Sequence, residues 1–326
     1  MCSATLCVAS DELDRGPFSA PHSGSVPRSM DRKLKQKMGN LLLSLDIHLS
    51  WMSREFKTTN VDDSYWKYWY DVRYGLTKAE RYNSSDTLLK KYEYAYDTAG
   101  NRVTKVLDGS TTYVYNYNTA NELTKQTAGG TDTTFAYDAW GRMTSKAQGS
   151  YSATYAYKYG DKLASVTSNF PDEGTVNYEY GGDGKMREKT IGSTTWPYLW
   201  DAGWNIINQN TSTKWTYVRG PAGEELAMWY GTNPSSTYWR YHHHDIIGSA
   251  RLGTNDNEEV IKTYEYTPYG EIYAESGWGS TGFKFTGALG PTYGLYYFPY
   301  RYYSPSVARW ITRDPLATPS VGDVSL

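Results

Sequence analysis

The sequence predicts an all-β protein, a strip of antiparallel β-hairpins that curves into a spiral or a partial shell. Its aromatic residues are mainly polar, with 33 Tyr and 12 Trp against 7 Phe, a composition that suits strands with one wet face. In segments 92–96 and 113–117 every second residue is a tyrosine. A period of two is that of a β-strand, so each strand is expected to present one aromatic face and one polar face.

A short turn-like unit recurs along the chain. From Tyr96 the repeated tyrosine returns after 21, 20, 20 and 23 residues. An Asp or Asn after the tyrosine can accept hydrogen bonds from turn amides, and a Gly four positions on permits a positive φ. Each unit is therefore a two-strand meander that depends on its neighbours for a core. The residues that define the repeat are Tyr96, Asp97, Gly100, Tyr117, Tyr137, Asp138, Gly141, Arg142 and Tyr180.

The first 60 residues differ in composition from the rest. All tyrosines lie between Tyr65 and Tyr303, which places a boundary near residue 61. Residues 1–29 are rich in Ser, Pro, Ala and Gly and are expected to be disordered. Apolar residues at helical spacing predict one amphipathic helix over about 31–56. Residues 1–60 are thus a helical and disordered leader.

Several classes of function are disfavoured by composition. A net charge of −2 gives no long-range positive field for phosphates, so no nucleic-acid partner is expected. Cys2 and Cys7 are the only cysteines, which excludes a disulfide framework and a thiolate metal site. No apolar run is long enough for a transmembrane segment, and no signal peptide is visible. No cofactor is expected.

Three local patterns might suggest chemistry. His242 and His244 would share a strand face, but a third ligand is missing, so packing is favoured over a metal site. The letters of G-x-G-x-x-G over 277–282 follow no buried strand and open no helix, so this segment is expected to be a loop. Protease-like carboxylate pairs would have to come from Asp138, Asp183, Asp201 and Asp314, for which turn or cap roles are favoured.

The C-terminal part contains ordered motifs over residues 241–251, 264–271, 283–287, 294–297 and 301–315. In this order they resemble the core of the Rhs/YD-repeat family, which is named for its Tyr-Asp dipeptide and is related to the shells of Tc-type toxins and teneurins. The resemblance is strongest over 235–315 and extends over 65–315. The matching core residues are Tyr241, His242, Asp245, Gly248, Arg251, Tyr269, Gly270, Phe285, Gly287, Gly294, Leu295, Tyr296, Arg301, Tyr302, Tyr303, Arg309, Asp314 and Pro315.

The resemblance implies a domain order and a function. Residues 61–234 would be YD repeats, 235–315 the Rhs repeat-associated core, and 316–326 a tail. In this family the strip winds into a hollow shell that commonly encloses a cytotoxic C-terminal portion, and the core plugs one end. The implied function is a non-enzymatic shell or scaffold that encapsulates, presents or helps deliver a polypeptide in a polymorphic-toxin context. A secreted or cell-surface location in bacteria is implied as well.

The chain departs from the family pattern in two respects. The cleavage signature Asp-Pro-x-Gly-Leu is not restored after Asp314-Pro315, so neither autoproteolysis nor a toxin domain is expected. About ten units are visible, fewer than a closed shell of the family would need, so we expect an open curved sheet and a truncated member. Its open edges would pair with further repeat segments or with a polypeptide cargo.

Two other functions remain open at this point. Tyr and Trp faces can stack on sugar rings, so the strip could be a cell-surface module that binds carbohydrate or protein. The aspartates could instead form a self-processing aspartyl peptidase in which two carboxylates share a proton. No catalytic, metal-binding or cofactor-binding residue is assigned.

Overall fold

The computed structural model describes residues 55–60, 62–210, 214–231, 239–279 and 281–315. Two sheets account for its strands: one of 21 strands and one of four strands. In the large sheet each strand pairs antiparallel with the next one along the chain, from β1 with β2 through to β20 with β21. The predicted all-β hairpin strip is therefore confirmed.

The strands of the large sheet are β1 (Glu55–Thr59), β2 (Tyr65–Tyr70), β3 (Leu76–Tyr82), β4 (Leu88–Tyr96), β5 (Arg102–Leu107), β6 (Thr111–Tyr117), β7 (Leu123–Ala128), β8 (Thr131–Tyr137), β9 (Met143–Gln148), β10 (Tyr151–Lys158), β11 (Lys162–Ser168), β12 (Thr175–Tyr180), β13 (Met186–Ile191), β14 (Thr194–Trp200), β15 (Ile206–Asn210), β16 (Lys214–Arg219), β17 (Glu225–Tyr230), β18 (Trp239–His244), β19 (Ala250–Thr254), β20 (Val260–Tyr266) and β21 (Ile272–Gly277). The small sheet contains β22 (Leu289–Thr292), β23 (Leu295–Tyr297), β24 (Tyr302–Ser304) and β25 (Arg309–Trp310), and a 3₁₀ turn, η1 (Phe285–Gly287), precedes it.

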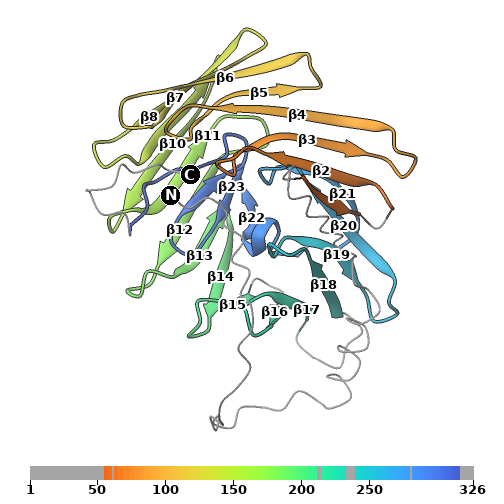
Figure 1. Cartoon of the computed structure of the whole chain (residues 1–326). Helices are drawn as coiled ribbons and strands as arrows, with labels where there is room; N and C mark the ends of the chain where they lie inside the picture. Colours follow the sequence, from red (N-terminus) through yellow and green to blue (C-terminus); the bar gives the residue numbers. More distant parts are fainter. Residues whose placement is uncertain (1–54, 61, 211–213, 232–238, 280, 316–326) are drawn as a thin grey trace, which may run out of the picture.

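The strip curves so strongly that its first and last strands face each other (Figure 1). No backbone ladder among the described strands joins β21 to β1, so the sheet stays open, as predicted. Side chains bring the two ends together instead: the Trp66 ring of β2 lies 5.7 Å, edge to face, from the Tyr273 ring of β21. The strip is thus a single spiral turn whose ends meet through side chains.

Each repeat unit ends in the same irregularity. A register shift precedes the repeated tyrosine, between Ala95 and Tyr96 and again between Ala136 and Tyr137. The following aspartate then closes the turn, since Asp138 Oδ1 accepts hydrogen bonds from the amides of Trp140 (2.9 Å) and Arg142 (3.0 Å). A β-bulge adds twist and bends its strand. Its recurrence in successive hairpins explains why the strip curves.

The repeated tyrosine also links each hairpin to the previous one. The Tyr117 hydroxyl donates to the carbonyl of Arg102 (2.9 Å), and the Tyr157 hydroxyl donates to that of Met143 (2.7 Å). The acceptor is in each case the first residue of the second strand of the preceding hairpin. Where tyrosine is replaced, another donor takes its place, as Trp200 Nε1 donates to the Met186 carbonyl (2.6 Å). At the equivalent position of the next hairpin Arg219 Nε donates to the Ile206 carbonyl (2.9 Å), so these positions share a hydrogen-bond donor but not always an aromatic ring.

The leader needs one correction. Residues 1–54, which carry most of the predicted disordered segment and helix, lie outside the described residues. The sheet already begins at Glu55, so the predicted helix cannot extend to Phe56 and the boundary at 61 is too late. Phe56 pairs with Tyr68 in β2 and packs edge-on against the Tyr70 ring at 5.3 Å. The composition change missed β1 because this strand contains no tyrosine.

The segment predicted as one core, 235–315, is split between the two sheets. Strands β18 to β21 continue the strip with unchanged hairpin geometry, and only the part from Phe285 onward forms the small sheet. The loop between them contains the glycine-rich run 277–282, of which Gly277 ends β21. The tail 316–326 lies outside the described residues.

Candidate functional site

The concave face of the strip holds the C-terminal segment of the same chain. In Figure 1 the blue strands β22 and β23 lie inside the curve formed by the large sheet. One hydrophobic cluster contains repeat residues such as Tyr115, Tyr178 and Tyr217 together with Leu295 and Tyr302 of the small sheet. The aromatic face predicted from the alternation is therefore the inner face, and it binds a segment of polypeptide.

Two turns of the strip receive the 3₁₀ turn η1. The amide of Thr286 donates to the Ser249 hydroxyl in the turn after β18 (3.0 Å). In the turn after β20, Gly270 has a φ of 92°, and a β-carbon there would overlap the Phe285 ring. The Gly270 carbonyl accepts a hydrogen bond from the Tyr296 hydroxyl (3.0 Å). Gly270 is thus required both by its backbone conformation and by the close approach of the ring.

Tyr269 connects the C-terminal segment to the first hairpins of the strip. Its carbonyl accepts a hydrogen bond from Tyr303 (3.0 Å), and its hydroxyl forms a short hydrogen bond with that of Tyr96. The guanidinium carbon of Arg102 lies 4.9 Å from the Tyr269 ring centre and 4.6 Å from that of Tyr115. Burial raises the pKa of Tyr269, so its hydroxyl keeps its proton.

Arg309 of β25 inserts between two repeat turns. Its Nη1 donates to Asn101 Oδ1 (3.1 Å) and its Nη2 donates to the Asn121 carbonyl (2.6 Å). The guanidinium also lies over the Tyr117 ring, 4.9 Å from its centre. An arginine can satisfy several acceptors at once with its planar fork. This contact ties the end of the small sheet to β4–β7, about 190 residues earlier in the chain.

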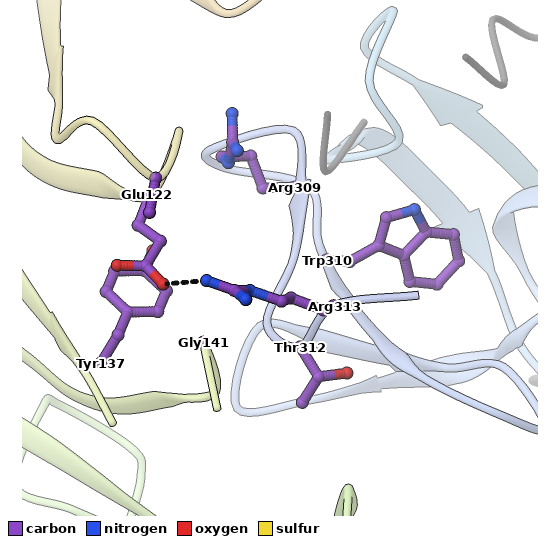
Figure 2. A pocket seen from close by; sticks show the side chains of 8 residues that line it. Glu122, Tyr137, Gly141, Arg309, Trp310, Thr312 and Arg313 are labelled. Carbon is purple, nitrogen blue, oxygen red and sulfur yellow. Dashed lines mark hydrogen bonds and ion pairs between the residues drawn. The ribbon is translucent and has the colours of Figure 1, made fainter. Parts of the chain in front are cut away.

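Arg313, which follows Arg309 in the chain, also contacts the repeat turns (Figure 2). Arg313 Nη2 lies 3.3 Å from Glu122 Oε1, and the Arg313 side chain crosses directly over Gly141, which has a φ of 76°. Arg301 and Asp314 form an ion pair of 2.9 Å within the C-terminal segment. Of the predicted core residues, Arg309 therefore anchors the segment to the strip, whereas Arg301 and Asp314 pair with each other within it.

A buried carboxylate lies beneath the predicted histidine motif. Glu225 Oε1 is 3.0 Å from His242 Nδ1, and Glu225 Oε2 accepts a hydrogen bond from the Thr281 hydroxyl (2.5 Å). Burial alone would raise the pKa of Glu225, but His242 and Thr281 bring it below its usual value. Burial lowers the pKa of His244 to about 4. Among the described residues, no group of three or more His, Cys, Asp or Glu could hold a metal ion.

The aspartates considered as protease carboxylates are all engaged in local contacts. Asp138 pairs with Arg142 (2.6 Å) and Asp183 with Arg187 (2.7 Å). Asp201 accepts the amide of Asn205 (2.8 Å). Each of these three closes its own turn, and Asp314 pairs with Arg301.

The remaining core residues occupy separate places. Tyr241 donates to Asp256 (3.0 Å), and Asp245 closes the β18–β19 turn by accepting the Ser249 amide (2.9 Å), with Gly248 at a φ of 82°. Arg251 contacts the Asn60 side chain, which places it where the two ends of the strip meet. Gly287 and Gly294 take φ values of 72°, Leu295 is buried, and Pro315 follows the last anchored residue.

The comparisons agree with this arrangement. Residues 117–153, which span β7, β8 and β9 with their turns, match the family model described as RHS Repeat. This stretch of the chain is therefore similar to the repeat that names the Rhs family. The chain is 31% identical over 84 residues to toxin subunit YenC1 of Yersinia entomophaga, covering 24% of this chain and 9% of that protein. It is 29% identical over 236 residues to the tRNA3(Ser)-specific nuclease WapA of Bacillus spizizenii, covering 68% of this chain and 10% of that protein.

A solved structure provides a further comparison. The crystal structure of TcdB2-TccC3 aligns with 82% of this chain and 18% of its own, at 16% identity and a TM-score of 0.40. This chain spans about a tenth of the length of the curated relatives that it matches. In its described part, no helix is both long enough and apolar enough to cross a bilayer.

Sequence reasoning missed the strip residues that receive the C-terminal segment of this chain. Asn101, Asn121 and Glu122 occupy the last position of a repeat turn or the one before it, and none of them was identified as a binding residue. Glu225 carried no visible motif, and Thr281 lay in the glycine-rich run 277–282, which was expected to be only a loop. Polar residues are common in turns just before a strand. The sequence alone therefore does not distinguish the turn residues that bind the C-terminal segment from the others.

Proposed function

We propose that this chain is a non-enzymatic β-scaffold whose concave aromatic face holds a polypeptide, as part of a shell that encloses, presents or helps deliver it. One observation carries the proposal: the inner face already binds the segment from Phe285 onward, through an aromatic cluster and the anchors Arg309 and Tyr303. A face that recognises one extended segment through rings and backbone carbonyls has the chemistry to hold another.

The shell role fits the relatives. YenC1 is a toxin subunit and WapA a nuclease, and this chain matches about a tenth of each. We place this chain in the same polymorphic-toxin context. Further repeat segments would pair with β1 and β21, the two edges of the open sheet. A secreted or cell-surface location accompanies this role.

Binding of an unfolded polypeptide by the full chain tests the proposal. A fluorescein-labelled unstructured peptide is titrated with the protein, and its anisotropy is recorded. Trp196→Ser removes a ring that packs against the inner-face cluster, whereas Leu199→Ser changes a side chain that is 56% exposed on the opposite face of the same strand. We expect binding to weaken in Trp196→Ser and to persist in Leu199→Ser. Equal binding by both variants, or no binding by the wild type, would contradict the proposal.

The non-enzymatic assignment is tested separately. The purified chain is incubated at mildly acidic pH, where a carboxylate dyad would share a proton, and its intact mass is followed. We expect the full-length mass to persist. A fragment that disappears on substitution of Asp138 or Asp314 would instead support the peptidase alternative.

A carbohydrate ligand is the second candidate, and one cavity favours it. A space of about 170 Å³ lies between the strip and the small sheet, lined by Trp200, Trp204, Arg219, Tyr297 and Phe298. Aromatic walls with a few polar groups suit a sugar ring. A glycan array probed with the wild type and with Trp204→Ala tests this candidate, and a hit that the variant retains would argue against this cavity as its site.

A further inference from the structure

Three lysines occupy the same position in alternate hairpins of the strip. Lys105 lies opposite Tyr94, Lys146 opposite Phe135 and Lys189 opposite Tyr178. Those three aromatic residues each precede the repeated tyrosine by two positions, so they point to the inner face. Directly opposite residues of an antiparallel pair share a face. The lysines therefore form a row on the concave side, in β5, β9 and β13.

Each lysine of this row lies over an aromatic ring. The Nζ atoms are 4.0 Å from the Tyr113 ring centre for Lys105, 4.4 Å from Phe170 for Lys146, and 5.2 Å from Trp196 for Lys189. Cation–π contact holds an ammonium in place without neutralising it. The rings therefore keep the three charges fixed at the face.

Among the described residues no carboxylate forms an ion pair with the row, although Glu271 and Glu173 act on Lys105 and Lys146 from farther away. The ion pairs between described residues, which extend to 4.0 Å, include none of these three lysines. By contrast, Lys91, Lys125 and Lys158 pair with Glu93, Asp132 and Glu179 at 2.9, 3.3 and 2.6 Å. Among hydrogen bonds in the described part, Lys189 Nζ donates to the neutral Thr292 hydroxyl at 3.2 Å.

Burial disfavours the charged ammonium, and it is the largest effect on the pKa of all three lysines. It lowers the pKa of Lys105 and of Lys146, and it lowers that of Lys189 to about 8. The inner face therefore retains cations at a cost in free energy, which an added anion would reduce.

The spacing of the row suits an extended chain. Neighbouring lysines are four strands apart, or about 19 Å at the usual strand separation. An extended polypeptide covers that distance in about six residues. From the register and the unpaired charges we propose that the lysine row, Lys105, Lys146 and Lys189, binds an acidic polypeptide segment that crosses the strands. This inference rests on the proposed polypeptide-holding function and adds the charge of the segment.

The test uses the full chain and three fluorescein-labelled peptides of Gly, Ser and one charged or polar residue type. The acidic peptide carries Glu, the second Gln at the same positions and the third Lys, each with about 18 residues, enough to reach all three lysines when extended. Anisotropy titrations at neutral pH and low salt give the dissociation constants. We expect the Glu peptide to bind about tenfold more tightly than its Gln analogue, as three weak ion pairs would give.

Two triple variants with the same change in net charge isolate the row. Lys105→Gln, Lys146→Gln and Lys189→Gln together are expected to remove the preference for Glu over Gln. Lys91→Gln, Lys125→Gln and Lys158→Gln together should preserve it. If the first triple variant fails to fold, the wild type still decides the matter, since its affinity for the Glu peptide must fall with added salt while that for the Gln peptide does not.

The outcomes separate the two proposals. Equal affinity for Glu and Gln peptides, with both triple variants unchanged, overturns the charge inference and leaves the polypeptide-holding function standing. Absence of binding by all three peptides overturns both. A preference that the second triple variant loses, or an oligonucleotide that binds the row more tightly than the Glu peptide, also overturns the inference.

Discussion

Arg81 and Glu265, 184 residues apart in the chain, form a two-point ion pair where the ends of the strip meet. Arg81 Nε lies 2.6 Å from Oε1 and Nη2 lies 2.9 Å from Oε2 of Glu265. The Trp66 indole donates to the same Oε1 at 2.6 Å. Only 11% and 10% of the two side chains are exposed, so this pair is buried. It closes the spiral turn without any backbone pairing between β1 and β21.

Removing the charge of Glu265 should therefore open the spiral. Glu265→Gln leaves Arg81 buried without its counter-charge, a change that typically costs about 3 to 5 kcal/mol. The free energy of unfolding of the full chain, from urea titration, measures the loss. Glu93→Gln is the control, because its 42% exposed side chain pairs with Lys91, which is itself 31% exposed, and should cost no more than about 1 kcal/mol. Equal losses would show that Glu265 does not hold the ends together.

The hydroxyl of the repeated tyrosine provides the second prediction. Tyr157→Phe keeps the ring but leaves the Met143 carbonyl without its 2.7 Å donor, so we expect a loss of about 1 to 2 kcal/mol in stability. Tyr159→Phe makes the same chemical change two residues later in a side chain that is 76% exposed, and should cost nothing measurable. Thermal unfolding of both variants checks this, and an unchanged Tyr157→Phe would reduce the role of the tyrosine to its ring.

The strip itself could be predicted because its signals are local. Alternation fixes which residues share a face, and the Tyr-Asp turn with Gly100 or Gly141 fixes where a hairpin ends, so each element depends on a few neighbouring residues. The hydroxyl-to-carbonyl links were not predicted. The bulge before Tyr96 arises from the pairing of β4 with β5, which the amino-acid sequence does not show.

The site on the strip that binds the C-terminal segment was only partly predictable. The motif residues Phe285, Tyr303 and Arg309 were identified by resemblance, but their partners were not. Arg309 meets Asn101 across 208 residues, and no local pattern encodes a contact of that separation. β1 was missed for a related reason, since it joins the sheet by pairing with β2 while lacking the composition of the repeats.

The third prediction distinguishes two reasons for a glycine: its backbone conformation and the close approach of another side chain. Gly109 and Gly270 both have positive φ, 69° and 92°, but nothing lies within 4 Å of a β-carbon added at Gly109, whereas the Phe285 ring occupies that place at Gly270. Gly109→Ala should cost about 1 kcal/mol for its backbone conformation alone.

Gly270→Ala should cost distinctly more than Gly109→Ala and should release the segment that follows Phe285. Limited proteolysis of the full chain, read by mass spectrometry, would show new cleavage between residues 281 and 315 in Gly270→Ala but not in Gly109→Ala. The same cleavage pattern in both variants would mean that the ring does not depend on this glycine.

The final prediction concerns pH. Burial lowers the pKa of His244 to about 4, against about 6.5 in an unfolded chain. Between these values the unfolded state binds the extra proton, so stability is fully present above pH 6.5 and declines as the pH falls to 4. The shift corresponds to a loss of about 3 kcal/mol at most. Glu225, whose pKa is also lowered, adds a further loss at still lower pH, so the two effects do not cancel.

His244→Asn should flatten the stability profile between pH 6.5 and 4. The measurement is the free energy of unfolding of the full chain in urea at a series of pH values. A wild-type profile that is flat over this window would show that His244 titrates normally in the folded chain. A slope that survives His244→Asn would assign the proton to another group.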